Sequence, residues 1–235
     1  MRYDCLLADA DGTLFNFHAG ERLAIRATLG AFGLPSDDGW IARYSRINDG
    51  HWKKLERSET TQKRLRVERF ADLLTAFRAE GYVADGLTPE QVGERFVAEL
   101  AKQRIPLTGA EDFLRQVSAA MPVYLVTNGI AVVQRSRFEQ SELRKYMTDL
   151  LISEEIGAAK PDPAILFEAV KREAERTGRT PAPVMLGDSL TADIAAARNA
   201  RIDSIWFTNG APITPDHGAT YAVQTLEEAA RLLLD

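Results

Sequence analysis

Short apolar runs alternate with stretches of helical periodicity from residue 106 onward, and this alternation limits the possible folds more than any other feature of the chain. Strands that are joined by helices in this order form parallel sheets, because each helical crossover returns the chain to the same end of the sheet. The sequence therefore predicts an α/β fold, with a parallel sheet that has helices on both faces. The expected strands cover residues 122–126, 149–152, 183–186, 202–207 and 220–223, and the expected helices cover 109–120, 130–140, 163–176, 190–200 and 225–234.

The part of the chain before residue 106 is organised differently. Its apolar residues 3–8 end abruptly at Asp9 and a turn, so they predict one more buried strand of the same sheet. After that strand the pattern is helical, with amphipathic stretches at 20–32, 38–56, 60–80 and 89–103. We therefore expect a core domain formed by residues 1–16 and 106–235, and an all-helical domain of residues 17–105 inserted after the first strand.

One helix start in this insert can be read from the sequence Thr88-Pro89-Glu90-Gln91. The hydroxyl of Thr88 can cap the helix, and proline suits its first turn. Gln91 stands where its side chain can bond back to the main chain of Thr88 and so complete a capping box. The segment predicts a helix that begins at Pro89.

Composition narrows the possible partners and the compartment. The 29 lysines and arginines are outnumbered by 34 aspartates and glutamates, which gives a net charge of -5, whereas binding to a nucleic-acid backbone needs a basic face. No apolar run approaches the roughly 18 residues of a membrane span, and the apolar stretch at the N-terminus is too short for a signal peptide. Cys5 is the single cysteine and cannot form an internal disulfide, which fits a reducing compartment. We expect a cytoplasmic protein that binds neither nucleic acid nor membrane.

Small polar residues follow the expected strands, and ligands of a parallel sheet bind at the carboxyl ends of its strands. Taken alone, each such group could be a turn or a helix cap. Taken together, they hold carboxylates, hydroxyls, an amide and an ammonium, which are the groups that bind Mg²⁺ and phosphate, since hard cations take oxygen ligands. The residues are Asp9, Asp11 and Thr13 after the first strand, Thr127, Asn128 and Gly129 after the second, Lys160 beyond the third, and Asp188 and Ser189 after the fourth, with Asp193 one helical turn later.

In this order, the motifs D-x-D-G-T-L, T-N-G, K-P and G-D-S-x-x-x-D resemble those of the haloacid dehalogenase-like (HAD) superfamily of hydrolases, from Asp9 to Asp193. The resemblance implies a Rossmann-like, doubly wound core with a helical cap. The insert is similar to the cap of the pyrimidine 5′-nucleotidases with house-cleaning roles. That second resemblance rests on Ile47-Asn48, Trp52, Glu56, Leu65 and Arg69-Phe70, and on the segment 11–15. Asn16 stands where this group often has aspartate. We expect this difference to tune the activity of the site and not to abolish it.

The two acids of the first motif suggest two catalytic roles. Asp9 ends the strand, so it is the better placed to attack phosphorus and form an aspartyl-phosphate, and the resemblance assigns it the same role. Asp11 can then protonate the leaving alkoxide and later deprotonate the attacking water. Lys160 supplies a positive charge for Asp9 and the phosphate.

A cation has to bridge Asp9 and the phosphate, because both are negatively charged. Asp9, the main-chain carbonyl of Asp11 and Asp188 are the expected ligands of Mg²⁺. We assign Asp193 to a position behind them, where it orients the ligands or Lys160. A plain alternative for Asp193 is an acid in the first turn of a helix, where the helix dipole favours it.

The remaining predicted site residues would bind substrate. The hydroxyl of Thr127 and the main-chain N–H groups near Asn128 and Gly129 lie where a helix begins, which is a ready anion site. Asn48 and Trp52 lie four residues apart, so on a helix they share a face, where one can pair with a pyrimidine edge and the other can stack on it. For Trp52 a place in the core of the insert is the competing interpretation.

The predicted function is a Mg²⁺-dependent phosphomonoester hydrolase that acts through an aspartyl-phosphate on a small phosphorylated metabolite, above all a nucleoside 5′-monophosphate. A broad-specificity metabolite or sugar-phosphate phosphatase is the first alternative, and a phosphoryl-group mutase is another. Carbon–halogen hydrolysis is opposed by Asp11, because a halide leaves without a proton and a second carboxylate would repel a haloacid. A non-catalytic binding protein on the same fold also stays open, because fold does not secure function.

Overall fold

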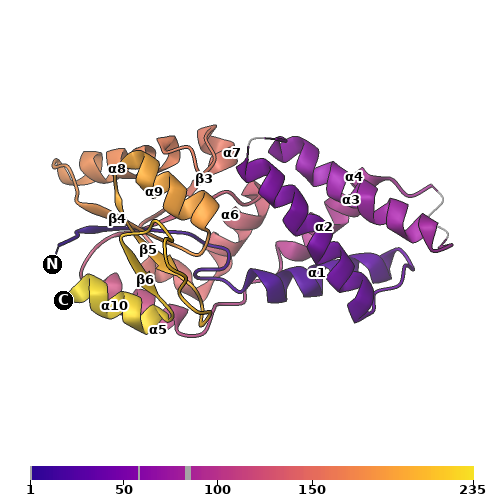
Figure 1. Ribbon diagram of the computed structural model, residues 1–235, viewed down its shortest axis with the longest axis horizontal. Coiled ribbons are helices and arrows are strands. Elements are labelled where there is room, and N and C mark those ends of the chain that lie inside the picture. The colour runs from indigo at the N-terminus through magenta and orange to yellow at the C-terminus, as the bar shows by residue number, and fades with distance from the viewer. Residues whose placement is uncertain (1, 58, 83–85) are drawn as a thin grey trace. The chain divides into compact units, whose positions relative to one another are not determined.

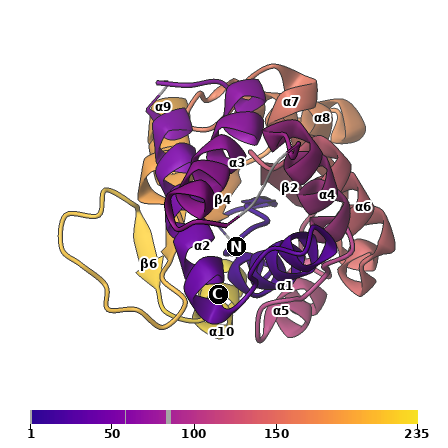
Figure 2. The same cartoon turned by 90° about the vertical axis from the view of Figure 1, so that its right-hand side faces the viewer.

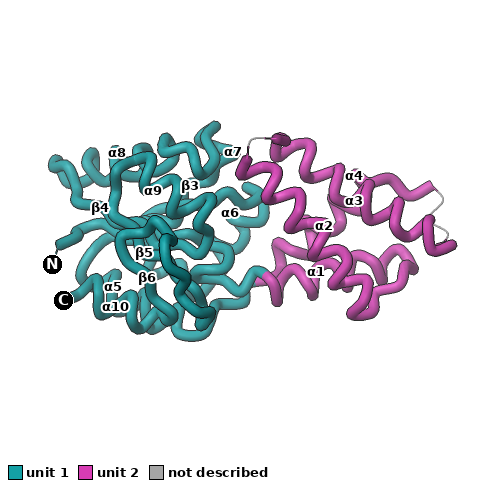
Figure 3. The backbone as a smooth tube through the Cα atoms, in the orientation of Figure 1, with its two compact units in different colours: residues 1–17, 104–235 teal, residues 18–103 magenta. Residues whose placement is uncertain are grey.

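The computed structural model describes residues 2–57, 59–82 and 86–235, and the chain divides into two compact units (Figure 3). Unit 1 consists of Met1–Phe17 and Arg104–Asp235, and unit 2 consists of His18–Gln103. Among the described residues, no helix combines the length and the apolar character that crossing a bilayer requires.

Unit 1 is built on a six-stranded sheet in which every neighbouring pair of strands is parallel, as the sequence predicts. The spatial order is β3-β2-β1-β4-β5-β6, so β1 is central and the order reverses between β1 and β4. In an open α/β sheet, ligands bind at such a reversal, outside the carboxyl ends of the strands. The strands are β1 (Cys5–Ala8), β2 (Val123–Thr127), β3 (Asp149–Ile152), β4 (Pro183–Gly187), β5 (Asp203–Phe207) and β6 (Tyr221–Val223).

Helices cover both faces of this sheet because successive strand residues point to opposite faces. In β1, Leu6 and Ala8 belong to one buried apolar cluster, which includes residues of α5, α6 and α10. Cys5 and Leu7 belong to a second cluster, with residues of α8 and α9. Figure 1 shows α8 and α9 on one side of the strands and α5 and α10 on the other, which is the doubly wound architecture expected. These helices are α5 (Ala110–Val117), α6 (Ala131–Gln140), α8 (Ala164–Thr177), α9 (Ala195–Ala200) and α10 (Leu226–Leu234).

Three short elements of unit 1 were not expected from the periodicity. Two of them, η1 (Glu142–Tyr146) and α7 (Ser153–Ile156), lie in what the sequence left as connections. The third is η2 (Leu190–Ile194), a π-helical turn at the start of the helix predicted for 190–200. Single π-helical turns are common at functional sites. The connection from β5 to β6 loops out beside β6 (Figure 2).

Unit 2 is entirely helical in its described residues, as expected for the insert. Its core is aromatic: Trp40 stacks on Phe77 with ring centroids 3.8 Å apart, and Tyr44 packs against Phe70 and Phe96. The capping box predicted at Thr88 is present and begins α4. The helices are α1 (Phe17–Ala31), α2 (Asp38–Glu56), α3 (Gln62–Ala79) and α4 (Pro89–Leu100).

Candidate active site

Three carboxylates meet where the strand order reverses. The main-chain N–H of Asp9 continues the β1–β4 pairing by donating to the carbonyl of Leu186, 2.9 Å away, so Asp9 is held at the end of the central strand. Asp188 follows β4 directly, and Asp193 lies in η2. Carboxylate oxygens of Asp9, Asp188 and Asp193 all lie within 4.8 Å of one another. The sheet therefore concentrates negative charge at the edge where a ligand is expected.

Lys160 supplies the positive charge inside this cluster. Its side chain is 1% exposed, and its Nζ atom lies 2.6 Å from Asp9 Oδ1 and 2.7 Å from Asp193 Oδ1. The same ammonium donates hydrogen bonds to Asp9 Oδ1 and to the main-chain carbonyl of Val126, the latter at 2.7 Å, whereas its contact with Asp193 is an ion pair. The other oxygen of Asp193 accepts from the main-chain N–H of Ser189 at 3.0 Å. Asp193 thus has the contacts of a residue that orients Lys160.

Burial and crowding shift the ionisation of these groups. Burial raises the pKa of Asp9 well above its ordinary value; Lys160 opposes this, and the charges of Asp193 and Asp188 add to it. Desolvation, followed by the charge of Asp193, raises the pKa of Asp188 to about 7. Burial alone would lower the pKa of Lys160, but Asp193 and Asp9 hold it above its ordinary value, so Lys160 is an ammonium. One ammonium leaves the three acids short of positive charge.

The set of donors fits Mg²⁺. Asp9 and Asp188 are oxygen ligands brought together from two strands, and burial, together with the charges of neighbouring acids, raises the pKa of both. A hard divalent cation that keeps several waters needs only one or two protein carboxylates. The residues present therefore suit a magnesium ion held by Asp9 and Asp188.

A glycine makes the close approach to Asp188 possible. The backbone of Gly12 has a φ of +92°, a conformation that favours glycine, and a Cβ built at this position would lie 2.4 Å from Asp188 Oδ2. The next residue, Thr13, donates from its hydroxyl to Asp188 Oδ1 at 3.1 Å. The indole N–H of Trp206 donates to the main-chain carbonyl of Asp188 at 2.9 Å. Asp188 is held through both its side chain and its main chain.

The T-N-G segment after β2 is tied to the lysine. Asn128 exchanges two hydrogen bonds with the main chain of Lys160: its Nδ2 donates to the carbonyl at 2.7 Å, and its Oδ1 accepts from the N–H at 2.8 Å. The hydroxyl of Thr127 accepts from the main-chain N–H of Gly129 at 3.0 Å. The structure thus brings Thr127, Asn128 and Gly129 beside Lys160, and the side chain of Asn128 fixes the loop that carries the lysine.

The carboxylate of Asp11 has other partners than the three clustered acids. Among the described residues, the group that could hold a metal through side chains contains Asp9, Asp188 and Asp193, but not Asp11. The side chain of Asp11 is instead held by α6: Arg137 forms an ion pair with its Oδ1, and Gln134 donates to its Oδ2 at 2.5 Å. The predicted metal contact of Asp11 is a main-chain one, so this side-chain arrangement is compatible with it.

The two predicted substrate residues of unit 2 lie on α2, and their surroundings differ. Asn48 is fully buried; its Nδ2 donates to Glu21 at 2.5 Å, and its Oδ1 accepts from Arg69 at 2.7 Å. Because Asn48 is fully buried, a base could reach its amide only if the surrounding side chains moved. Trp52 is half-buried.

Three contacts of the site were missed from the sequence: those of Gln134 and Arg137 to Asp11, and that of Trp206 to Asp188. The first two had a signal. Along α6 the buried residues are Val133, Gln134, Arg137 and Phe138, so a glutamine and an arginine occupy the face where helical periodicity calls for apolar residues. Trp206 offered no such signal, since an aromatic residue is ordinary in a buried strand.

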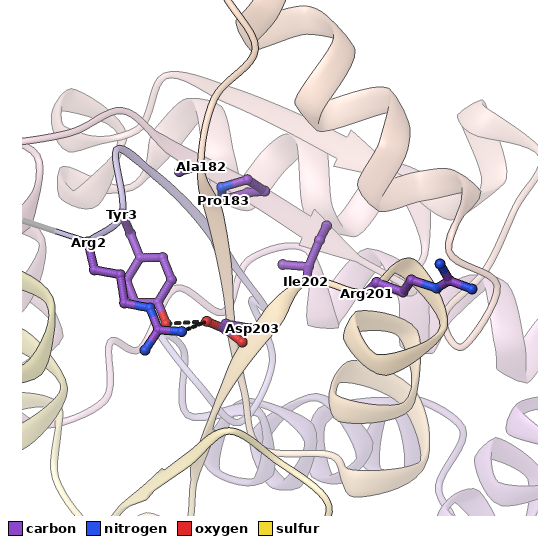
Figure 4. A pocket seen from close by; sticks show the side chains of 7 residues that line it. All are labelled: Arg2, Tyr3, Ala182, Pro183, Arg201, Ile202 and Asp203. Carbon is purple, nitrogen blue, oxygen red and sulfur yellow. Dashed lines mark hydrogen bonds and ion pairs between the residues drawn. The ribbon is translucent and has the colours of Figure 1, made fainter.

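A hollow lies at the other end of the strands, and none of the three clustered acids lines it. It has a volume of about 300 Å³, and its lining residues precede or begin β1, β4 and β5 (Figure 4). Its one carboxylate, Asp203, already accepts from the Tyr3 hydroxyl at 2.6 Å and pairs with Arg2 at 2.9 Å. This hollow therefore does not contain a second cluster of acids.

Known proteins share this sequence along nearly its whole length. A profile for haloacid dehalogenase-like hydrolases matches residues 3–201. The HAD-hydrolase YfnB of Bacillus subtilis is 34% identical, over 99% of this chain and 96% of its own. The pyrimidine 5′-nucleotidase PynA of Streptococcus pneumoniae is 34% identical, over 88% of this chain and 84% of its own. The pyrimidine 5′-nucleotidase YjjG of Escherichia coli is 28% identical, over 99% of both chains.

Solved structures agree with the sequence matches. A crystal structure of YfnB bound to magnesium has a TM-score of 0.87 with this chain, at 30% identity and with 100% of both chains covered. The L-2-haloacid dehalogenase Rha0230 has a TM-score of 0.71 at 15% identity, covering 99% of this chain and 96% of its own. At that identity the second likeness shows a shared fold alone.

Proposed function

Because the chain belongs to the haloacid dehalogenase-like hydrolases, we propose that it is a Mg²⁺-dependent phosphomonoesterase with Asp9 as its nucleophile. The observation that carries this proposal is the arrangement around Asp9: a carboxylate fixed at the end of the central strand, paired with a buried ammonium and close to two further acids. Unit 1 acts as the catalytic core in this proposal, and unit 2 as the cap that selects the leaving group. The predicted domains 1–16 with 106–235, and 17–105, correspond to these roles.

Asp9 attacks phosphorus with the oxygen that is not occupied by Lys160, and the ester oxygen leaves. This forms an aspartyl-phosphate and an alcohol, so one difficult displacement is divided into two easier ones. The second carboxylate oxygen stays on the lysine, which limits rotation of the nucleophile. Lys160 also lowers the repulsion between Asp9 and the dianionic phosphate.

Magnesium bound by Asp9, Asp188 and the main-chain carbonyl of Asp11 would neutralise charge on the phosphate oxygens. Around it, this chain's residues keep the ligands in place. Thr13 and Trp206 hold Asp188 from two sides, and Asp193 holds Lys160. Removing such supporting contacts commonly lowers metal affinity or activity by about 10–100-fold.

Asp11 serves as the acid and base of the cycle. It donates a proton to the ester oxygen as the first bond breaks, and it later takes a proton from the water that hydrolyses the aspartyl-phosphate. Thr127, with the main-chain N–H groups near Asn128 and Gly129, binds the phosphoryl oxygens. Donors in this position accelerate the reaction if their bonds tighten in the transition state.

We further propose that the substrates are pyrimidine nucleoside 5′-monophosphates. Two relatives that cover most of this chain, PynA and YjjG, are named pyrimidine 5′-nucleotidases. Within unit 2, Trp52 is only half-buried, and an indole ring is a surface on which a base can stack. Asn48 supports the proposal less directly, because its amide is already bonded to Glu21 and Arg69.

Phosphate release from a panel of esters tests the proposal. The panel contains pyrimidine and purine 5′-monophosphates, sugar phosphates and p-nitrophenyl phosphate, each with Mg²⁺ and with EDTA. We expect release with Mg²⁺ only, fastest for the pyrimidine nucleotides, and none from Asp9→Asn. Preference for sugar phosphates would keep the phosphatase and discard the nucleotidase. No release from any ester would discard both.

A further inference from the structure

Both oxygens of the Asp11 carboxylate are held by α6. Arg137 pairs with Oδ1 through Nη1, and Gln134 donates to Oδ2 through Nε2 at 2.5 Å. The two helix residues lie three positions apart, so they share a face of α6. One oxygen bound by each donor fixes the plane of the carboxylate as well as its position.

The two donors lie in the protein interior, where a polar group without a partner destabilises the fold. Gln134 and Arg137 are each 2% exposed, on the same face of α6 as buried Val133 and Phe138. A buried charge without a partner is strongly unfavourable, whereas an apolar residue of similar volume is tolerated well in such a place. Packing of α6 alone would therefore be served by apolar residues at these two positions.

Two neighbouring residues, Phe15 and Gly129, accommodate the contact of Arg137 and Gln134 with Asp11. The guanidinium carbon of Arg137 lies 5.2 Å from the centroid of the Phe15 ring, which belongs to the same segment as Asp11. Gly129 leaves room for the other donor, because a Cβ on Gly129 would lie 2.1 Å from Nε2 of Gln134. A side chain at Gly129 would push Gln134 away from Asp11.

We infer that Gln134 and Arg137 are positioning residues, which fix the carboxylate of Asp11 for proton transfer to the ester oxygen. This inference rests on the proposed function and deepens it, since it assigns two residues to the acid step. The proton moves from the Asp11 carboxyl to the departing oxygen as the phosphorus–oxygen bond breaks. A carboxylate that is free to turn would reach that oxygen in only a fraction of its orientations.

The leaving group provides a readout that a purely structural role would not change. An alkyl phosphate releases a poor leaving group that needs the proton from Asp11, whereas p-nitrophenyl phosphate releases a stable phenolate that does not. The ratio kcat/KM reports the steps up to formation of the aspartyl-phosphate. Loss of positioning should therefore lower kcat/KM for the alkyl ester far more than for the aryl ester.

The experiment compares Arg137→Met with wild type on glycerol phosphate or a nucleoside 5′-monophosphate and on p-nitrophenyl phosphate. We expect a loss of about 10–100-fold on the alkyl ester, and a loss within about threefold on the aryl ester. Arg135→Met is the matched control: Arg135 lies on the same helix but is half exposed and pairs with Glu155, so both esters should be unaffected. Gln134→Leu should show the same split as Arg137→Met, and it carries the test if Arg137→Met does not fold.

The Asp11→Asn background separates positioning from other effects. If Arg137 acts through Asp11, adding Arg137→Met to Asp11→Asn should cause no further loss on the alkyl ester. Equal losses on both esters, or the same fold-loss in both backgrounds, would overturn the inference and leave Arg137 as an anchor for α6. A wild-type enzyme that cleaves neither ester would overturn the proposed function itself, which is a distinct result.

Discussion

The ammonium of Lys160 lies 2.6 Å from a carboxylate oxygen of Asp9, although 151 positions separate the two residues in the sequence. The contact forms because Asp9 ends β1 while Asn128, at the end of β2, grips the main chain of Lys160. The ends of β1 and β2, with the loop that carries Lys160, thus place one positive charge beside the negative charge of Asp9. This relationship makes Lys160 a residue on which both stability and chemistry depend.

Replacing Lys160 with methionine should destabilise the protein. The change leaves Asp9 and Asp193 buried without their shared cation, and breaking a buried pair costs about 3–5 kcal/mol. Chemical denaturation at neutral pH in EDTA measures this loss. Lys171→Met is the control, because the ammonium of Lys171 is exposed and its nearest carboxylate oxygens lie 3.8 and 3.9 Å away. A loss no larger than that of the control would contradict the account of the charge cluster.

The acid cluster should make the metal-free protein less stable as pH rises. The pKa of Asp188 is raised to about 7, so between its ordinary value and about 7 the folded state binds more protons than the unfolded state. Stability then falls with rising pH in that window, because the proton lost from the folded protein leaves an uncompensated charge. In EDTA, Asp188→Asn should be more stable than wild type above neutral pH, and the difference should shrink on acidification.

Magnesium should reverse this trend. Because Mg²⁺ competes with the protons, thermal unfolding should show a larger Mg²⁺-induced rise in Tm above neutral pH than below it. The rise should be absent in Asp188→Asn. A Mg²⁺ effect that is the same in the variant as in wild type would remove Asp188 from the metal site.

Much of the fold and of the site could be predicted from the sequence. The six strands follow from the periodicity of the apolar residues, and the polar site residues follow from their position directly after the strands. The partners of those residues could not. Asn128 has the same amide whether it binds a phosphate or the main chain of Lys160, and only the packed sheet decides between these. Likewise, nothing local in the sequence shows that Asn48 lies between Glu21 and Arg69. Long-range hydrogen bonds depend on how elements pack, whereas periodicity reports only which face is buried.

Gly12→Ala should damage the metal site. Its Cβ would lie 2.4 Å from Asp188 Oδ2, in a backbone conformation of positive φ. We expect a destabilisation of about 1–3 kcal/mol together with weaker Mg²⁺ binding, measured by denaturation and by Mg²⁺ titration of activity. Gly30→Ala is the control, because Gly30 lies in α1 with open space around its would-be Cβ, so alanine there should be neutral or stabilising. An unchanged Mg²⁺ dependence of Gly12→Ala would refute the role given to this close approach.

Selectivity for the base should depend on Trp52. Trp52→Phe should lower kcat/KM for pyrimidine 5′-monophosphates by about tenfold, because a stacking contact contributes roughly 1–3 kcal/mol. p-Nitrophenyl phosphate has no base, so its hydrolysis should change little. Trp40→Phe alters the same helix at a ring that stacks on Phe77, and it should affect both substrates alike. Asn48→Ala serves as a second probe; parallel losses on both substrates in Asn48→Ala and Trp52→Phe would assign both residues to packing of unit 2.

The central claim is that Asp9 receives the phosphoryl group, and a crystal structure with Mg²⁺ and beryllium trifluoride tests it most directly. Beryllium trifluoride mimics a phosphoryl group on a carboxylate, and its binding should also raise Tm by mass action. We expect beryllium bonded to Asp9, at the oxygen that Lys160 leaves free. Beryllium bonded to any other side chain, or no binding at all in the presence of Mg²⁺, would contradict the account.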